Sequence, residues 1–338
     1  MVQYRPSGPI QWLFSKLPQR DWYFSGCIST EERSTSAALW FSQNVRPLPE
    51  ASSIAWINDT FVPDVGLVKA LKQQRLLALN ATSWSSQRLS ELDLLATPAL
   101  MQGLFNGTNL AGHKSILLDI TSFPKRFFFY LVRLLLSEPM CEDLVITYTI
   151  PRRYAQTLAG DPQSAMALPT FVASAPDQEI DLAIVGVGFE PLGLADALQQ
   201  HQARQVRVML PFPSAQDAYI RNLEFVGDLE RRYGTNVMPE PDRVNGLDCS
   251  ACFDAICAMT ANGTRTSLIA PYGPKPMSLA MCLFSLAVAE KKLPQVPAYY
   301  AQPRSYAPDY SSGVAVSAIG ERILSYVVKW DGQRLYAL

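Results

Sequence analysis

Two segments of the chain share one arrangement of residue types: an apolar run, a short turn ending in Pro-Lys, and a second apolar run. They cover residues 116–136 and 267–289, and their lysines are Lys125 and Lys275. Each segment predicts a buried strand, a turn, and a helix that begins at or just after the lysine. A helix N-terminus attracts anions, and a lysine beside it needs an anion nearby to be favourable. The two turns therefore predict contacts with an anionic ligand such as a nucleotide.

The polar and small residues of these two turns are the candidate ligand contacts. The first turn offers a carboxylate, two hydroxyls and a cation, and the second offers a phenol, a cation and a glycine that lets the backbone approach a ligand. Two interpretations of Asp119 stay open: a ligand contact, or a carboxylate that stabilises its own turn. For both lysines the alternative is a solvated residue in the first helical turn. The candidates are Asp119, Thr121, Ser122, Lys125, Tyr272, Gly273 and Lys275.

A glycine-rich stretch at 186–193 adds Gly186 and Gly188 to the candidates. It superficially resembles a dinucleotide-binding fingerprint, but its third glycine comes five residues after the second instead of three. Proline at the expected first helical position has a structural explanation, so the sequence favours a tight strand-to-helix turn over an NAD site. The turn remains a ligand candidate, because ligands of open parallel sheets bind at the carboxyl ends of strands.

A tyrosine-rich stretch at 299–313 holds four tyrosines, two prolines and Arg304. Tyrosine and arginine together offer stacking faces and charge-assisted hydrogen bonds, which suit bases and phosphates or a partner protein. The alternative is a proline-stiffened strand edge that covers a sheet with half-buried tyrosines. Arg304 is the candidate ligand contact of this stretch.

The composition describes a well-buried globular protein. Of 338 residues, 48% are hydrophobic and 17% are charged, and the net charge of −1 gives no global basic field for duplex nucleic acid or a membrane surface. Residues 1–18 lack the apolar run of a secretory signal. The longest charge-free apolar run, 277–289, is shorter than the roughly 20 residues of a membrane-spanning helix. We therefore expect a soluble, cytoplasmic protein.

The six cysteines include one Cys-x-x-Cys pair, Cys249 and Cys252, which is a possible metal or redox motif. No second such pair exists, and the two histidines, His113 and His201, lie far away in the sequence. The surrounding residues 247–259 have the pattern of an amphipathic helix with both cysteines on its apolar face. We expect buried structural cysteines, no metal and no cofactor.

Strands and helices alternate along most of the chain, which is typical of α/β proteins with mostly parallel sheets. We expect two Rossmann-like lobes, at 1–150 and 178–338, with 151–177 as a connecting segment. The expected strands are 22–28, 53–57, 115–120, 144–149, 180–187, 206–210, 264–270 and 298–300, with a hairpin of 323–330 and 334–337. The expected helices are 31–42, 65–79, 89–105 with a break at Pro98, 125–137, 192–202, 215–233, 247–259 and 277–291.

The run from Asp119 through Thr121 to Lys125 resembles the ligand loop of the CRISPR-associated Rossmann-fold (CARF) sensor domains, and the turn from Gly273 to Lys275 is similar. In this chain Phe-Pro and Gly-Pro stand where that family has Gly-Thr. The resemblance implies binding of a cyclic oligonucleotide at a homodimer interface. It also implies a sensor or effector in bacterial antiviral defence.

Three functions stay open at the level of the sequence. The first is a nucleotide-binding sensor or regulatory subunit, which binds its ligand without consuming it. The second is a nucleotide hydrolase or glycosidase that uses carboxylates near strand ends, and the third is a protein-interaction subunit of a larger complex. The carboxylates available to an enzyme are Glu31, Glu32, Asp59, Asp119 and Glu190.

Overall fold

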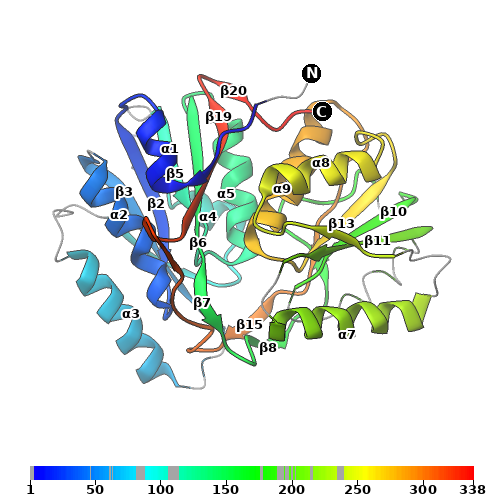
Figure 1. The fold of residues 1–338 in the computed structure, drawn as a ribbon, viewed down its shortest axis with the longest axis horizontal. Helices are drawn as coiled ribbons and strands as arrows, with labels where there is room; N and C mark the ends of the chain where they lie inside the picture. The colour runs from blue at the N-terminus through cyan, green and yellow to red at the C-terminus, as the bar shows by residue number, and fades with distance from the viewer. Residues whose placement is uncertain are drawn as a thin grey trace. The chain divides into compact units, whose positions relative to one another are not determined.

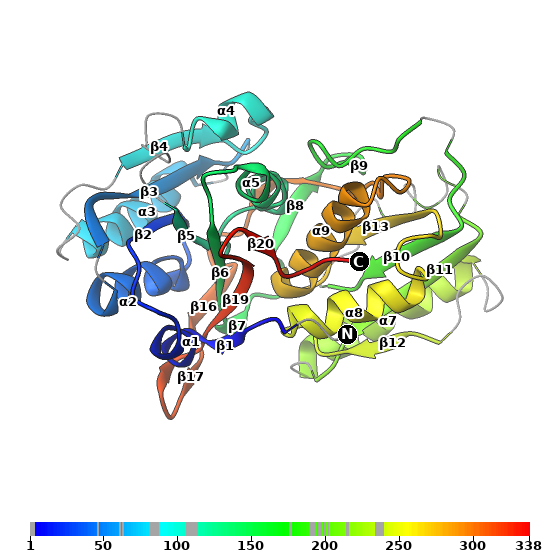
Figure 2. The same cartoon turned by 90° about the horizontal axis from the view of Figure 1, so that it is seen from above.

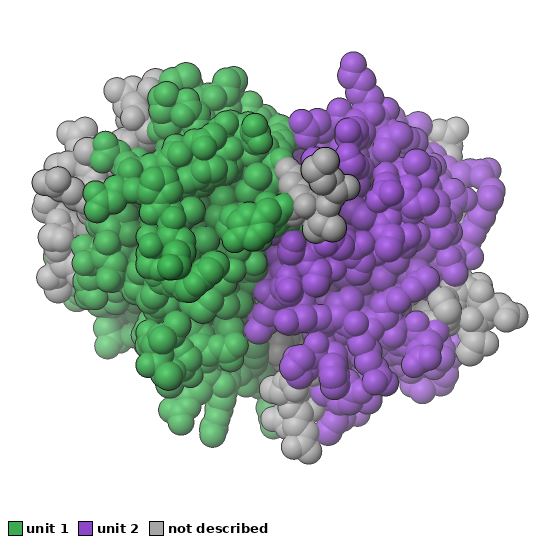
Figure 3. All heavy atoms as spheres, turned by 45° about the horizontal axis from the view of Figure 1, so that its top comes forward, with its two compact units in different colours: residues 1–161, 303–335 green, residues 162–302, 336–338 purple. Residues whose placement is uncertain are grey.

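The computed structural model describes residues 4–338 except 46, 61, 63, 81–87, 106–113, 176–177, 189–193, 195–197, 199–200, 202, 214–215 and 234–239. The chain divides into two compact units (Figure 3). Unit 1 comprises Met1–Asp161 and Pro303–Leu335, and unit 2 comprises Pro162–Gln302 and Tyr336–Leu338. The sequence-based division at 151–177 assigned 303–335 to the second lobe, whereas these residues belong to unit 1 and 323–334 contributes two strands to its sheet.

Unit 1 contains an eight-stranded, mostly parallel sheet with the order β1-β19-β6-β5-β2-β3-β4 and β20 on β19. Strands β6, β5, β2, β3 and β4 run parallel, and β19 is antiparallel to both β6 and β1. The central strand β2 has all seven residues buried, as expected for a strand covered on both faces. The strands are β1 Ser7–Pro9, β2 Trp22–Ile28, β3 Pro47–Asn58, β4 Arg88–Asp93, β5 Ser115–Asp119, β6 Asp143–Thr149, β19 Ile323–Trp330 and β20 Gln333–Arg334.

Helices cover both faces of this sheet (Figures 1 and 2). One face carries α1 Ile10–Lys16, α2 Ser36–Asn44 and α3 Val65–Asn80, whose apolar residues join one core cluster with Phe24 and Leu117. The other face carries α4 Pro98–Gln102 and α5 Lys125–Ser137. The short 3-10 helix η1 Glu32–Thr35 joins β2 to α2.

The chain changes direction between the adjacent strands β2 and β5. From β2 it proceeds through β3 to β4 on one side, and from β5 it proceeds to β6 on the other side. The loops that follow β2 and β5 therefore diverge at the carboxyl edge of the sheet, which makes this a topological switch point. In open parallel sheets, ligands bind at such points.

Unit 2 contains a four-stranded, all-parallel sheet with the order β12-β11-β10-β13. Its strands are β10 Leu182–Gly186, β11 Gln205–Pro211, β12 Asp242–Val244 and β13 Ser267–Pro271, and its helices are α7 Gln216–Tyr233, α8 Cys249–Met259 and α9 Lys275–Glu290. After α9 the chain returns to the outer side of β13, where Ala298 forms a parallel bridge with Ile269. This sheet therefore has its own switch point, between β10 and β13.

Four two-stranded ribbons accompany the sheets. Three of them use the segment 151–167, where the sequence indicated only a connection, and their partners come from 299–314. The pairs are β7 Pro151–Tyr154 with β16 Ser311–Val314, β8 Ala159–Pro162 with β15 Pro303–Tyr306, β9 Met166–Ala167 with β14 Tyr299–Tyr300, and β17 Val316–Ser317 with β18 Gly320–Glu321.

The structure confirms most predicted elements and corrects one. The predicted helix 89–105 is wrong over its first part, because Arg88–Asp93 forms strand β4 beside β3. The helical part is limited to α4, where the Thr97 side chain accepts a hydrogen bond from the Leu100 N–H. The predicted helix 192–202 lies mostly outside the described residues.

No helix among the described residues combines the length and the apolar character needed to cross a membrane.

Candidate functional site

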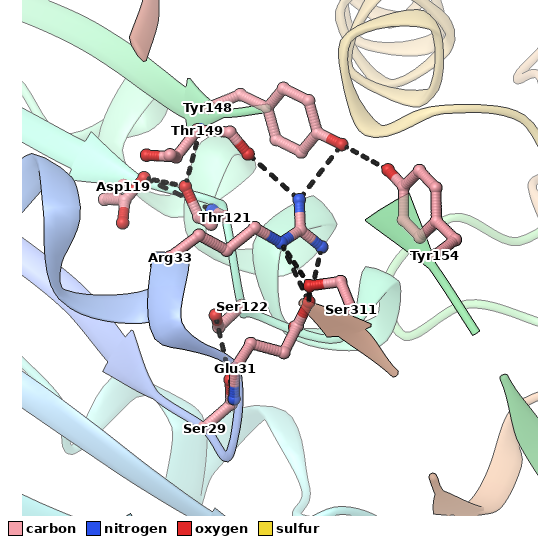
Figure 4. A network of polar contacts seen from close by, with 10 residues as sticks. All are labelled: Ser29, Glu31, Arg33, Asp119, Thr121, Ser122, Tyr148, Thr149, Tyr154 and Ser311. Atoms are coloured by element: carbon pink, nitrogen blue, oxygen red, sulfur yellow. Dashed lines mark hydrogen bonds and ion pairs between the residues drawn. The ribbon is translucent and has the colours of Figure 1, made fainter. Parts of the chain in front are cut away.

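Two serine hydroxyls meet at the switch point of the unit 1 sheet (Figure 4). Ser29 follows β2 and Ser122 follows β5, and their Oγ atoms lie 3.1 Å apart. The Ser29 Oγ also accepts a hydrogen bond from the Glu31 N–H at 3.1 Å. Both side chains are half-buried, so the hydroxyl pair lies at the surface of the carboxyl edge. A ligand at this point would meet polar groups from both loops.

Asp119 and Thr121 lie beneath this pair and hold the turn after β5 in place. The Asp119 Oδ1 accepts hydrogen bonds from the N–H and the hydroxyl of Thr121, at 3.3 and 2.5 Å, and from the Thr147 hydroxyl at 3.1 Å. The Thr121 hydroxyl in turn accepts from the Thr149 N–H at 2.9 Å. Both Asp119 and Thr121 are almost fully buried. These contacts fit the turn-stabilising interpretation of Asp119.

Lys125 is the first residue of α5 and follows the turn directly, as the sequence predicted. Its side chain is only 8% exposed. Within α5, all of whose residues are described, the first turn has no acidic residue, and no side chain caps the helix start. The carboxyl end of β5 thus combines a hydroxyl pair, a helix N-terminus and an ammonium group. This set of groups favours an anion.

A buried arginine fixes the loop after β2. Arg33, 2% exposed, forms an ion pair with Glu31, with the Nη2 and Oε2 atoms 2.8 Å apart. It also donates to the Ser311 hydroxyl at 3.1 Å, to the Tyr148 hydroxyl at 3.1 Å and to the Thr149 carbonyl at 2.9 Å (Figure 4). The arginine therefore joins η1 to β6 and to β16.

The charge of Arg33 is stabilised by its surroundings. Burial opposes this charge, but the Glu31 carboxylate and the hydroxyls of Tyr148 and Tyr154 outweigh it, so the pKa of Arg33 stands well above its ordinary value. The pKa of Tyr154 is also raised, first by burial and then by Tyr148, whose hydroxyl lies 2.8 Å from its own. The network beneath the edge is therefore a buried ion pair that is hydrogen-bonded to serine and tyrosine hydroxyls.

The unit 2 candidates lie together at the switch point between β10 and β13. A Cβ at Gly188 would lie 1.8 Å from the Tyr272 carbonyl oxygen, and one at Gly273 would lie 2.6 Å from the Met277 Sδ. A Cβ at Gly186 would lie 2.9 Å from the Met281 Cε. Gly188 thus allows the two turns to pack closely, and Gly186 and Gly273 leave room for methionine side chains of α9, which is a structural reason for all three.

The other two unit 2 candidates occupy different surroundings. The buried Tyr272 hydroxyl accepts a hydrogen bond from the Ala301 N–H at 3.1 Å, and burial raises the pKa of Tyr272. Lys275 begins α9, which has no side-chain cap, as Lys125 begins α5. The predicted repetition of strand, turn, Pro-Lys and helix is therefore present in both units.

Arg304 lies apart from the other candidates. It is on β15 of unit 1, where its Nη1 is 3.4 Å from the Asp161 Oδ2 in an exposed ion pair. The tyrosine-rich stretch is divided: Tyr299 and Tyr300 belong to unit 2, and Tyr306 and Tyr310 belong to unit 1.

The cysteines of the Cys-x-x-Cys pair lie on α8, as predicted, and both are buried. Burial raises the pKa of Cys252 to about 12, which keeps it a neutral thiol at physiological pH. In the described part of the chain, no group of three or more His, Cys, Asp or Glu residues is arranged to hold a metal ion.

Sequence reasoning missed the role of Arg33 and its contacts with Tyr148 and Ser311. The only local signal was a basic residue directly after Glu31 and Glu32 at the start of the expected helix 31–42. Its partner Ser311 is 278 residues away in the chain.

No protein-family model matches this chain, and no curated protein matches it in sequence. The case for a function therefore depends on the geometry of the site.

Proposed function

We propose that the chain binds an anionic, nucleotide-like ligand at the carboxyl edge of the unit 1 sheet and serves as a cytoplasmic sensor in bacterial antiviral defence. The observation that carries the proposal is the pair of hydroxyls from Ser29 and Ser122 at the switch point, followed by Lys125 at an uncapped helix start. In this proposal both units are Rossmann-like lobes, and the chain forms a homo-oligomer as the resemblance to CARF domains implies.

The contacts of the carboxylates favour binding over turnover. A general acid or base must reach its substrate. The Glu31 carboxylate is paired with Arg33, and the Asp119 carboxylate accepts hydrogen bonds from Thr121 and Thr147. Asp59 accepts a hydrogen bond from the Tyr306 N–H. These three acids are engaged in holding the edge together, which supports a sensor; of the other two candidate acids, Glu32 is exposed and Glu190 lies outside the described residues.

Mass spectrometry of the denatured, purified protein tests the proposal. We expect an intact, phosphate-containing nucleotide to be released in a stoichiometric amount. A cleaved nucleotide would support the hydrolase or glycosidase instead. Recovery of no nucleotide, together with a stable complex with another protein, would favour the interaction subunit.

Two variants then locate the site. Lys125→Ala and Ser122→Ala should each reduce ligand retention. For Lys125→Ala we expect the affinity for the ligand to fall by about ten- to a hundredfold, because a charge-assisted hydrogen bond contributes about 1.5–3 kcal/mol. Lys114→Ala is the matched control, since Lys114 immediately precedes the opposite end of β5 and its side chain is 60% exposed. Equal loss of ligand in the control and in Lys125→Ala would exclude the proposed location.

A further inference from the structure

An exposed aromatic ring lies at the carboxyl edge of the unit 2 sheet. Phe212 follows β11 directly and is 46% exposed. Its backbone is fixed, because the Phe212 N–H donates to the Val244 carbonyl at 2.8 Å and so extends the pairing of β11 with β12. A single exposed apolar residue is ordinary in itself. Phe212 differs from such a residue in the side chains that surround its ring.

Two side chains flank the Phe212 ring. The Tyr219 ring of α7 contacts it edge-on, with centroids 6.1 Å apart and planes at 64°. The Arg243 guanidinium, from β12, lies 5.8 Å from the Phe212 centroid, within the range of a cation–π contact. Tyr219 itself packs against the core of unit 2. The Phe212 ring thus packs against Tyr219 and lies next to the exposed guanidinium of Arg243.

The turn that carries Lys275 lies close to the end of β11, which Phe212 follows. A Cβ at Gly246 would lie 3.0 Å from the Pro211 Cβ and 3.3 Å from the Pro274 Cγ. Pro211, which precedes Phe212, and Pro274, which precedes Lys275, therefore both pack against Gly246. Phe212, Arg243 and Lys275 are therefore on neighbouring segments of this edge of the sheet.

Two acidic residues close to Arg243 in the sequence, Asp242 and Asp248, have partners of their own. Asp242 forms a bidentate ion pair with Arg207, with Nε to Oδ2 and Nη2 to Oδ1 distances of 2.9 and 2.5 Å. The Asp248 side chain accepts from the Ala251 N–H at 2.9 Å and caps α8. Both carboxylates are thus directed to other partners.

We propose that this edge of unit 2 is a second, base-stacking site, which binds a nucleoside phosphate independently of the unit 1 site. The base stacks on the exposed face of Phe212, and Arg243 and Lys275 contact the phosphate. Aromatic stacking and nearby cations are the combination by which proteins bind single nucleotides and single strands without reading sequence. The ligand source is a free nucleotide or the 5′ end of a single strand, since both present this chemistry.

A tryptophan at position 212 provides a direct assay, because the sequence has no tryptophan within unit 2. The full-length Phe212→Trp variant is titrated with AMP, ribose 5-phosphate and 5′-phosphorylated oligoadenylate, and its fluorescence is compared with that of the parent protein. We expect saturable quenching by AMP or the oligonucleotide. Ribose 5-phosphate, which has no base, should quench at least about tenfold less effectively.

Calorimetry with the same ligands completes the test. In the Lys125→Ala background, which weakens the proposed unit 1 site, Phe212→Ala should weaken AMP binding by about tenfold or more, and Phe212→Tyr should retain it, because tyrosine keeps the stacking face. Lys125→Ala should leave the quenching unchanged, which separates this site from the one in unit 1. Tighter binding of AMP than of the oligonucleotide identifies a free nucleotide as the ligand, and the reverse identifies a strand end.

Two results would overturn the proposal. One is the absence of saturable binding by both AMP and the oligonucleotide, and the other is equal affinity for AMP in Lys125→Ala and in the double variant Lys125→Ala with Phe212→Ala. Self-association that disappears in Phe212→Ala, without nucleotide binding, would assign the exposed ring to a protein contact instead.

Discussion

Replacing Arg33 by methionine should strongly destabilise unit 1. The arginine is 2% exposed and its ion-pair partner Glu31 is 7% exposed. Methionine fills a similar volume but leaves a buried carboxylate without its counter-ion, and it removes the hydrogen bond to the Thr149 carbonyl. Breaking one partner of a buried ion pair costs about 3–5 kcal/mol. We expect the free energy of unfolding of unit 1 to fall by about that amount.

The double variant Arg33→Met with Glu31→Gln separates the charge effect from lost packing. It removes both charges, so the penalty of an unpaired buried carboxylate disappears. The Ser311 hydroxyl retains a neutral oxygen at position 31 as its acceptor. We expect the double variant to be more stable than Arg33→Met alone by about 1–3 kcal/mol.

Tryptophan fluorescence during urea unfolding measures this effect in unit 1 alone. All six tryptophans, at positions 12, 22, 40, 56, 84 and 330, belong to unit 1. The transition is therefore not mixed with the unfolding of unit 2, which a single global signal would include. A loss below about 1 kcal/mol in Arg33→Met, or a double variant no more stable than the single one, would show that the buried ion pair does not stabilise unit 1.

Three further outcomes follow from the structure. Gly188→Ala should destabilise unit 2 by about 1–3 kcal/mol or more, because its Cβ would lie 1.8 Å from the Tyr272 carbonyl oxygen. Circular dichroism should show this loss of stability, while the urea midpoint followed by tryptophan fluorescence stays unchanged. Gly227→Ala is the control, because its Cβ would make only a 3.6 Å contact within α7. Burial raises the pKa of Asp59, so its charge destabilises the folded state at pH 7. Asp59→Asn should therefore raise the urea midpoint at pH 7. This gain should vanish as the pH falls below 3.8, the ordinary pKa of an aspartate, because the Asp59 carboxyl is then neutral in both the folded and the unfolded state. All six cysteines are free and buried, and the pKa of Cys252 is raised to about 12 by burial. A thiol reagent at pH 8 should therefore label essentially no cysteine before unfolding and all six after it. Rapid labelling of the native protein would contradict the buried placement.

The local signals of the sequence determined individual elements well. Strand β2 at 22–28 and helix α5 at 125–137 have the predicted bounds, because a continuous apolar run and a helical apolar pattern are readable within a few residues. The same holds for the placement of Lys125 and Lys275 at helix starts, since an apolar helical pattern begins directly after each Pro-Lys turn. The mostly parallel α/β class followed from the alternation of such elements.

The tertiary structure alone decided which elements pair. Residues 88–93 carry apolar residues compatible with a helix, and they form β4 because the edge of β3 accepts them. Strand β19 joins the unit 1 sheet beside β6 from a position far along the chain.

The candidate site depends on the same non-local pairing. Ser29 and Ser122 are 93 residues apart, and their hydroxyls meet only because β2 and β5 become neighbours in the sheet. Arg33 and Ser311 are 278 residues apart. Nothing local to either residue encodes its partner, because a pairing between distant segments is selected by the packing of the whole sheet. The sequence by itself therefore determined which residues end the strands, and the topology decided which of them share a site.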